Sequence, residues 1–161
     1  MTKAKENLDI NYQPRIVGFV CNWGAYSGVE MAGVERREYP TSIKLVRLMC
    51  LGRLHLGLIL KAFELGADGV MLLGCPPGNC HYESGMEKAK EMFTQASKML
   101  DLLGIDRKRL ALVEVPLGGG DLLAKKVSGF AKRVSRAGSS PLCSNNNESI
   151  EIIEGALSCR K

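Results

Sequence analysis

Four short apolar runs rich in β-branched residues alternate with helical segments along this 161-residue chain. The runs are predicted strands, and they cover residues 15–21, 42–50, 67–75 and 109–116. A helical segment follows each of them. This alternation predicts a parallel sheet, because parallel neighbours need a crossover that a helix usually supplies. We therefore expect an α/β fold: a single flavodoxin-like domain with a four-stranded parallel sheet, strand order 2-1-3-4 and helices on both faces.

The helices are predicted from apolar spacing and from end signals. Ser27 is the expected N-cap of the first, and Ser84 with Glu87 has the spacing of a capping box for the third. Gly104 can end that third helix. The predicted helices cover 27–38, 52–66, 84–103 and 121–136. The expected organisation is an N-terminal arm over 1–14, one domain over 15–137 and a C-terminal tail over 138–161.

Composition excludes several classes of protein. A net charge of +5 and an aromatic content of 6% argue against a nucleic-acid partner. No apolar run reaches the roughly 20 residues that a membrane span needs, and the polar start MTKAKENLDINYQP does not have the pattern of a signal peptide. We therefore expect a cytoplasmic protein. Six cysteines in a reducing compartment indicate metal or redox chemistry rather than structural disulfides.

Three predicted strands end in a cysteine. Cys21, Cys50 and Cys75 end the first, second and third strands, and Cys80 follows in the next loop. Parallel strands share one carboxyl edge and lie about 4.8 Å apart, so these thiols converge if the strands are neighbours. Four thiolates can hold zinc, a [2Fe–2S] cluster or a [4Fe–4S] cluster. The alternative is that they are buried apolar thiols, and Cys143 and Cys159 in the tail are read as incidental.

The loop C-P-P-G-N-C, residues 75–80, adds a geometric argument. Pro76 and Pro77 fix φ, and Gly78 permits a tight turn. Backbone N–H groups of residues 78–81 could then point at sulfur, which would tune a bound metal. The C-x4-C spacing itself is weak evidence, because it does not separate iron from zinc.

Three blocks carry a resemblance to a known family: C-N-W at 21–23, M-C-L-G-R at 49–53 and G-C-P-P-G-N-C-H-Y-E-S-G at 74–85. Together, in this order, the blocks resemble the iron-sulfur (delta) subunit of methyl-viologen-reducing hydrogenase. The resemblance covers roughly residues 14–136. It implies one [2Fe–2S] cluster in a subunit that passes electrons between a partner oxidoreductase, such as a hydrogenase, and the flavin-containing A subunit of a heterodisulfide-reductase-type complex. Such complexes occur in anaerobes and are linked to electron bifurcation.

The chain departs from that family at Gly24, where the family usually has a second cysteine. If the cluster is retained, the resemblance implies that its ligands are Cys21, Cys50, Cys75 and Cys80. If the family uses that missing cysteine as a ligand, there are three alternatives: the cluster is lost, an oxygen or nitrogen ligand replaces the cysteine, with His81 the nearest candidate, or Cys21 takes over.

The leading interpretation is an electron-transfer subunit of an oxidoreductase complex that does no bond chemistry itself. The alternative is a zinc-stapled or cluster-free structural adaptor of the same kind of complex. A thiol redox protein is a further alternative, against which the absence of C-x-x-C argues. A flavin carrier is disfavoured because CNWGAYSG, not a phosphate-binding loop, follows the first strand.

Overall fold

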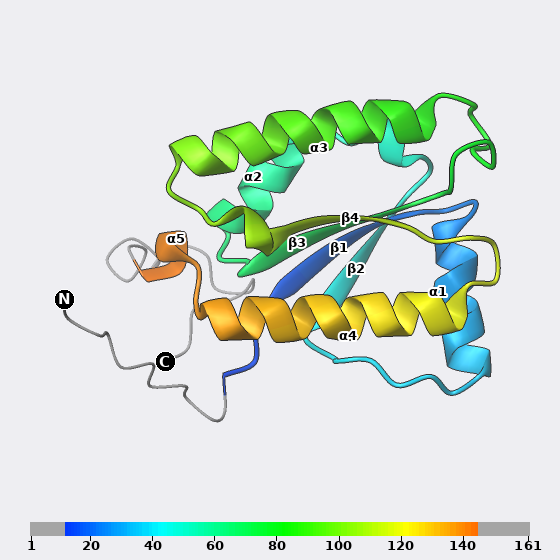
Figure 1. The fold of residues 1–161 in the computed structure, drawn as a ribbon, viewed down its shortest axis with the longest axis horizontal. Helices are drawn as coiled ribbons and strands as arrows, with labels where there is room; N and C mark the ends of the chain where they lie inside the picture. Colours follow the sequence, from blue (N-terminus) through cyan, green and yellow to red (C-terminus); the bar gives the residue numbers. More distant parts are fainter. Residues whose placement is uncertain (1–11, 145–161) are drawn as a thin grey trace.

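The computed structural model describes residues 12–144, and Figure 1 shows their arrangement. Four parallel strands form one sheet in the order β2-β1-β3-β4. The strands are β1 (Ile16–Cys21), β2 (Ile43–Leu48), β3 (Gly69–Gly74) and β4 (Leu110–Glu114). The predicted α/β fold and the predicted strand order are both confirmed.

Helices cover both faces of the sheet. The longer ones are α1 (Ala25–Val34), α2 (Leu56–Glu64), α3 (Gly85–Leu102) and α4 (Gly120–Ala137). Helices α1 and α4 pack together on one face, and α2 and α3 on the other (Figure 1). Short helical turns are η1 (Leu51–Arg53), η2 (Arg107–Arg109) and α5 (Pro141–Ser144). Among the helices described between residues 12 and 144, none combines the length and apolar character that crossing a bilayer requires.

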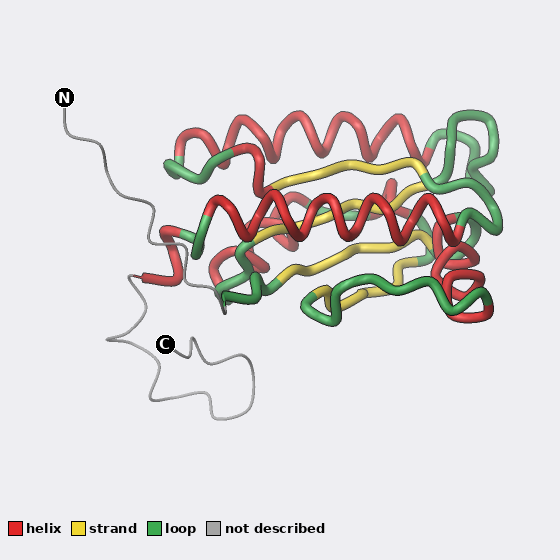
Figure 2. Tube along the Cα trace, turned by 60° about the horizontal axis from the view of Figure 1, so that its bottom comes forward, coloured by secondary structure: helices red, strands yellow, loops and turns green. Residues whose placement is uncertain are grey.

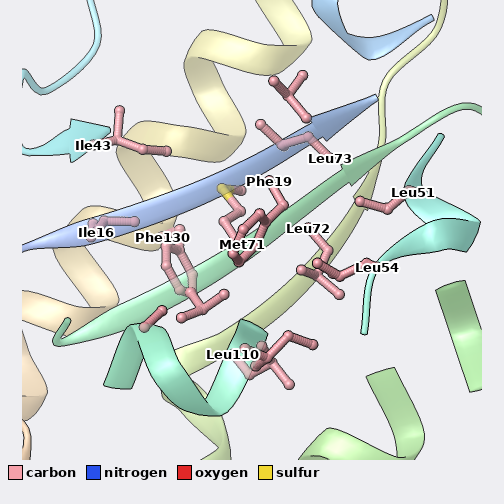
Figure 3. Packing of buried hydrophobic residues seen from close by; sticks show 14 of the residues in the cluster. Ile16, Phe19, Ile43, Leu51, Leu54, Met71, Leu72, Leu73, Leu110 and Phe130 are labelled. Carbon is pink, nitrogen blue, oxygen red and sulfur yellow. The ribbon is translucent and has the colours of Figure 1, made fainter. Parts of the chain in front are cut away.

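Strand β3 is the centre of the core, and each of its six residues is buried. A side chain at Gly69 would meet Phe130 of α4, whereas one at Gly74 would meet Met86 of α3. Alternate residues of β3 therefore face opposite helix layers, and Figure 3 shows Met71 and Leu72 among the packed side chains. Burial on both faces explains why this strand is a continuous apolar run.

Two expected helix starts differ in the structure. Helix α1 begins at Ala25, so Ser27 lies inside it; its hydroxyl donates to the Gly24 carbonyl oxygen (2.6 Å) and accepts from the Gly118 N–H (3.0 Å). The predicted helix over 52–66 is divided into η1 and α2, because the His55 ring accepts a hydrogen bond from the Gly57 N–H and caps α2.

The predicted start of the third helix is confirmed in position but not in its capping hydrogen bond. Ser84 is the N-cap position of α3 as expected, but its side chain makes no capping hydrogen bond. Part of the predicted tail is ordered into α5, which contacts α2. Most of the predicted arm over 1–14 and of the tail over 138–161, with Cys159, lies outside the described residues.

A buried polar network closes the amino edge of the sheet. The Arg109 guanidinium donates to the carbonyl oxygens of Asp68 and of residues 137–139, where α4 ends, at 2.7–3.1 Å. The Asp68 carboxylate accepts from the Arg15 and Ser140 N–H groups, each at 2.8 Å. Burial, and the nearby Asp68 carboxylate, raise the pKa of Tyr12 well above its usual range. The network ties the end of α4 to the starts of β1 and β3.

We predict that Arg109→Met destabilises the metal-free chain by about 3 kcal/mol, because buried carbonyl oxygens lose their donor. Urea unfolding followed by circular dichroism measures this. Arg136→Met, an exposed arginine in the last turn of α4, is the matched control and should change the free energy of unfolding by less than about 0.5 kcal/mol. Equal effects of the two substitutions would contradict the role assigned to Arg109.

Candidate metal centre

The four predicted thiols lie at the carboxyl edge of the sheet. Cys21 is the last residue of β1, Cys50 lies just after β2, Cys75 directly follows β3, and Cys80 lies in the loop between β3 and α3. These three strands are neighbours in the order β2-β1-β3, so the loops that follow them meet at one end of the sheet, as Figure 2 shows. We call these four residues the thiol cluster.

Cys21 and Cys75 form one pair within the thiol cluster. Their sulfur atoms are 3.5 Å apart, and both side chains are almost fully buried. The Cys21 thiol also lies 3.9 Å from the carbonyl oxygen of Met49, in the loop after β2. Each of these contacts joins segments that are distant in the sequence.

Cys50 and Cys80 form the second pair, beside the first residue of α3. A Cβ atom built on Gly85 would lie 2.4 Å from the Cys50 sulfur and 2.7 Å from the Cys80 sulfur. No real Cβ atom tolerates such contacts, so the amino end of α3 reaches these sulfurs only because Gly85 has no side chain. Gly52 in turn lies against Gly85, since a Cβ at 52 would be 2.7 Å from the Gly85 Cα.

Burial governs the protonation of two of the thiols. It raises the pKa of Cys75 to about 12, and the neighbouring Cys21 and Cys80 thiols add to the effect, whereas the Gly24 N–H opposes it. Burial likewise raises the pKa of Cys50, with further contributions from Cys80 and Cys21. The two pairs therefore interact electrostatically as one group. In the metal-free chain Cys50 and Cys75 are neutral at pH 7, so metal binding must release protons.

The donor set fits a thiolate-bound metal group. Four thiols converge at this edge, and Gly24 and Gly85 lie directly against their sulfur atoms. Soft thiolates select zinc or iron–sulfur clusters. Within residues 12–144, no three His, Cys, Asp or Glu side chains are arranged to hold a single ion. The sulfurs are instead arranged as two neighbouring pairs.

Aromatic side chains lie over this edge. The Trp23 and His81 rings stack, with their centroids 4.1 Å apart and their planes 20° apart, and Tyr82 contacts the edge of His81 at 5.0 Å. The stack joins the loop after β1 to the loop after β3. His81 is exposed, and its ring contacts both Trp23 and Tyr82. Tyr26 instead lies under the Arg47 guanidinium, 4.7 Å from its ring centroid.

The loop over 75–80 has the tight turn that its sequence predicts. Gly78 has φ +79°, and the Asn79 N–H donates to the Pro76 carbonyl oxygen at 3.1 Å. Sequence reasoning did not find the role of Gly85, although the pair Ser84–Gly85 at the start of a long helix marks where the helix meets the loop. The pairing of the sulfurs had no sequence signal.

The chain was compared with known proteins. Residues 16–138 match the family model described as the methyl-viologen-reducing hydrogenase, delta subunit. The D-type iron-sulfur subunit of the vhc F420-non-reducing hydrogenase of Methanococcus voltae is 50% identical over 100 residues, which are 62% of this chain and 69% of that protein. Its vhu counterpart in Methanocaldococcus jannaschii, also a D-type iron-sulfur subunit, is 36% identical over 129 residues, which are 80% of this chain and 96% of that protein.

A second kind of relative is much longer. The A-type subunit of the ferredoxin:CoB-CoM heterodisulfide reductase of Methanosarcina mazei is 33% identical over 125 residues, which are 78% of this chain and 16% of that protein. A region homologous to this chain is thus also found as part of a larger reductase polypeptide. With the match over residues 16–138, these similarities establish that the chain belongs to the methyl-viologen-reducing hydrogenase delta subunit family.

Proposed function

We propose that the chain is an electron-transfer subunit that holds one [2Fe–2S] cluster on Cys21, Cys50, Cys75 and Cys80. The observation that carries the proposal is the arrangement of four sulfurs as two adjacent pairs at the carboxyl edge of the sheet. A [2Fe–2S] cluster ligated by four cysteines takes two thiolates on each iron. We assign Cys21 and Cys75 to one iron, and Cys50 and Cys80 to the other.

A cluster with four protein thiolates supplies one-electron transfer and leaves no ligand position for a substrate. The chain's own residues position and shield it. The thiols are held by three loops on a rigid sheet, and the Trp23–His81 stack lies over the same edge. We therefore assign the protein no bond chemistry of its own, and reduced thiols of this kind suit the cytoplasm, where we place it.

The partners follow from the relatives. Two relatives are named as D-type iron-sulfur subunits of hydrogenases, and a third as the A-type subunit of a heterodisulfide reductase. We propose that the chain takes electrons from a hydrogenase or a comparable oxidoreductase. It would pass them to a flavin-containing subunit of the heterodisulfide reductase A type, in a complex capable of electron bifurcation. The presence of a homologous region within such an A-type polypeptide supports a close association between the two.

The surface around the thiol cluster suits a protein partner. Trp23, Met49 and Tyr82 are 42%, 54% and 48% exposed, and each comes from a different loop at the carboxyl edge. Exposed apolar side chains grouped around a redox site are typical of an interface. A partner seated here would bring its own cofactor close to the cluster.

The alternative is a zinc-stapled or cluster-free adaptor in the same kind of complex, because the same four thiols suit zinc. The paired arrangement of the sulfurs favours two metal ions over one. Metal analysis separates the two functions, because a zinc protein is colourless and carries no sulfide.

We predict about two irons and two sulfides per chain in protein purified without oxygen, with a [2Fe–2S] EPR signal after reduction by dithionite. Serine substitution of any member of the thiol cluster should lower iron to less than half of the wild-type content, because a ligand is lost. Cys143→Ser, in α5 near the opposite end of the sheet, is the control and should leave iron unchanged (Figure 1). Zinc without iron would refute the electron-transfer function.

We also predict that Gly85→Ala reduces iron content or shifts the EPR signal, because a methyl group there would displace the Cys50 and Cys80 sulfurs. The measurement is iron per chain, with circular dichroism to check folding. Gly129→Ala is the matched control: it lies within α4 and a Cβ there meets nothing within 4 Å. That variant should keep all its iron and gain up to about 1 kcal/mol from helix propensity. Full iron content and an unchanged signal in Gly85→Ala would contradict the role assigned to Gly85.

A further inference from the structure

Gly24 lies directly against the sulfur of Cys75. A Cβ atom built on Gly24 would be 2.7 Å from the Cys75 sulfur, 3.3 Å from the Cys75 Cβ and 3.6 Å from its Cα. A side chain at position 24 therefore begins at the place where the Cys75 sulfur now lies. The two positions come from different loops, one after β1 and one after β3.

The backbone at Gly24 is fixed by its surroundings. Gly24 is buried and precedes the first residue of α1, Ala25, which is fully buried. The Gly24 carbonyl oxygen accepts from the Ser27 hydroxyl, which in turn accepts from the Gly118 N–H in the loop before α4. A new side chain at 24 cannot be accommodated by moving this anchored turn at low cost, so the Cys75 side chain has to move.

We infer that side chains at residues 24 and 75 would reach the same coordination site of the metal group. Because Gly24 has no side chain, this site is left to Cys75. This inference rests on the proposed cluster. It answers the question raised by the missing second cysteine: the chain has kept a complete set of four ligands, and a thiol at 24 would compete with Cys75 rather than add a fifth ligand.

The distance between the Cβ positions of residues 24 and 75 also supports this inference. Cysteines that form disulfides have Cβ atoms about 3.5–4.5 Å apart. The Cys75 Cβ lies 3.3 Å from the Cβ position of residue 24, just below that range. A thiol at 24 could therefore reach the Cys75 sulfur directly.

The test is rescue of a lost ligand. Cys75→Ser, Gly24→Cys with Cys75→Ser, and Gly33→Cys with Cys75→Ser are each reconstituted without oxygen, using ferrous iron and sulfide. Iron and sulfide per chain and the EPR signal are then recorded. Gly33 lies in α1, and a Cβ there meets nothing within 4 Å, so it controls for an added thiol. We expect Cys75→Ser to lose more than half of its iron, the double variant at 24 to regain most of it, and the control to regain none.

Two results overturn the inference. One is full iron in Cys75→Ser, which would remove Cys75 from the ligand set. The other is no recovery in a double variant at 24 that folds, as judged by circular dichroism. Absence of iron from the wild-type chain would instead refute the proposed function, so the two failures are distinguishable.

A second measurement covers a double variant that does not fold, and it needs no metal. Metal-free Gly24→Cys protein is treated with oxidised glutathione, which accepts two electrons and two protons as two thiols join in a disulfide. Peptide mass spectrometry should find position 24 linked to Cys75 in more than half of the chains. The Gly33→Cys variant should show no link between 33 and 75. If no disulfide forms between residue 24 and Cys75, the inference that the two residues share one coordination site is wrong.

Discussion

The parallel register of β1 with its two neighbours determines where the four sulfurs lie. Cys21 is level with Leu48 of β2, and Val20 is level with Leu73 of β3. The three strands therefore end together, and the residues that follow them meet without a long loop. A shift of one residue in β1 would turn its side chains to the opposite face and remove the Cys21 sulfur from Cys75. The site thus depends on backbone hydrogen bonds of the sheet as much as on the cysteines.

Close backbone approach is the second requirement of the site. Gly52 and Gly85 bring η1 and the amino end of α3 into contact, and Gly24 brings the turn before α1 against Cys75. In each case a single methyl group would occupy space that a backbone or sulfur atom now holds. The pairing of the sulfurs is therefore set largely by residues that have no side chain, which is why a search for ligand types alone does not reveal it.

The strands, the helices and their order in the sheet could be predicted from the sequence. Hydrophobic periodicity identifies the elements, and the alternation of strands and helices indicates a parallel sheet. Apolar runs predicted the four strands, and the shared carboxyl edge of a parallel sheet predicted that the four thiols meet. Local hydrogen bonds were less predictable. The His55 cap of α2 is local, but histidine is not among the preferred N-cap residues, so the sequence did not indicate it. The hydrogen bond from the Gly118 N–H to the Ser27 hydroxyl joins two distant segments, so only the folded chain supplies it. The same holds for the Trp23–His81 stack, which joins residues brought together by the topology.

Two helices begin at the thiol cluster, α1 beside Cys75 and α3 beside Cys50 and Cys80. The amino end of a helix carries roughly half a positive elementary charge. Each of these helix ends therefore contributes a partial positive charge to the edge. These dipoles favour negative charge, so they act against burial, which raises the pKa of Cys50 and Cys75. For the proposed cluster, the two helix ends would favour the reduced state, which carries one more negative charge than the oxidised state.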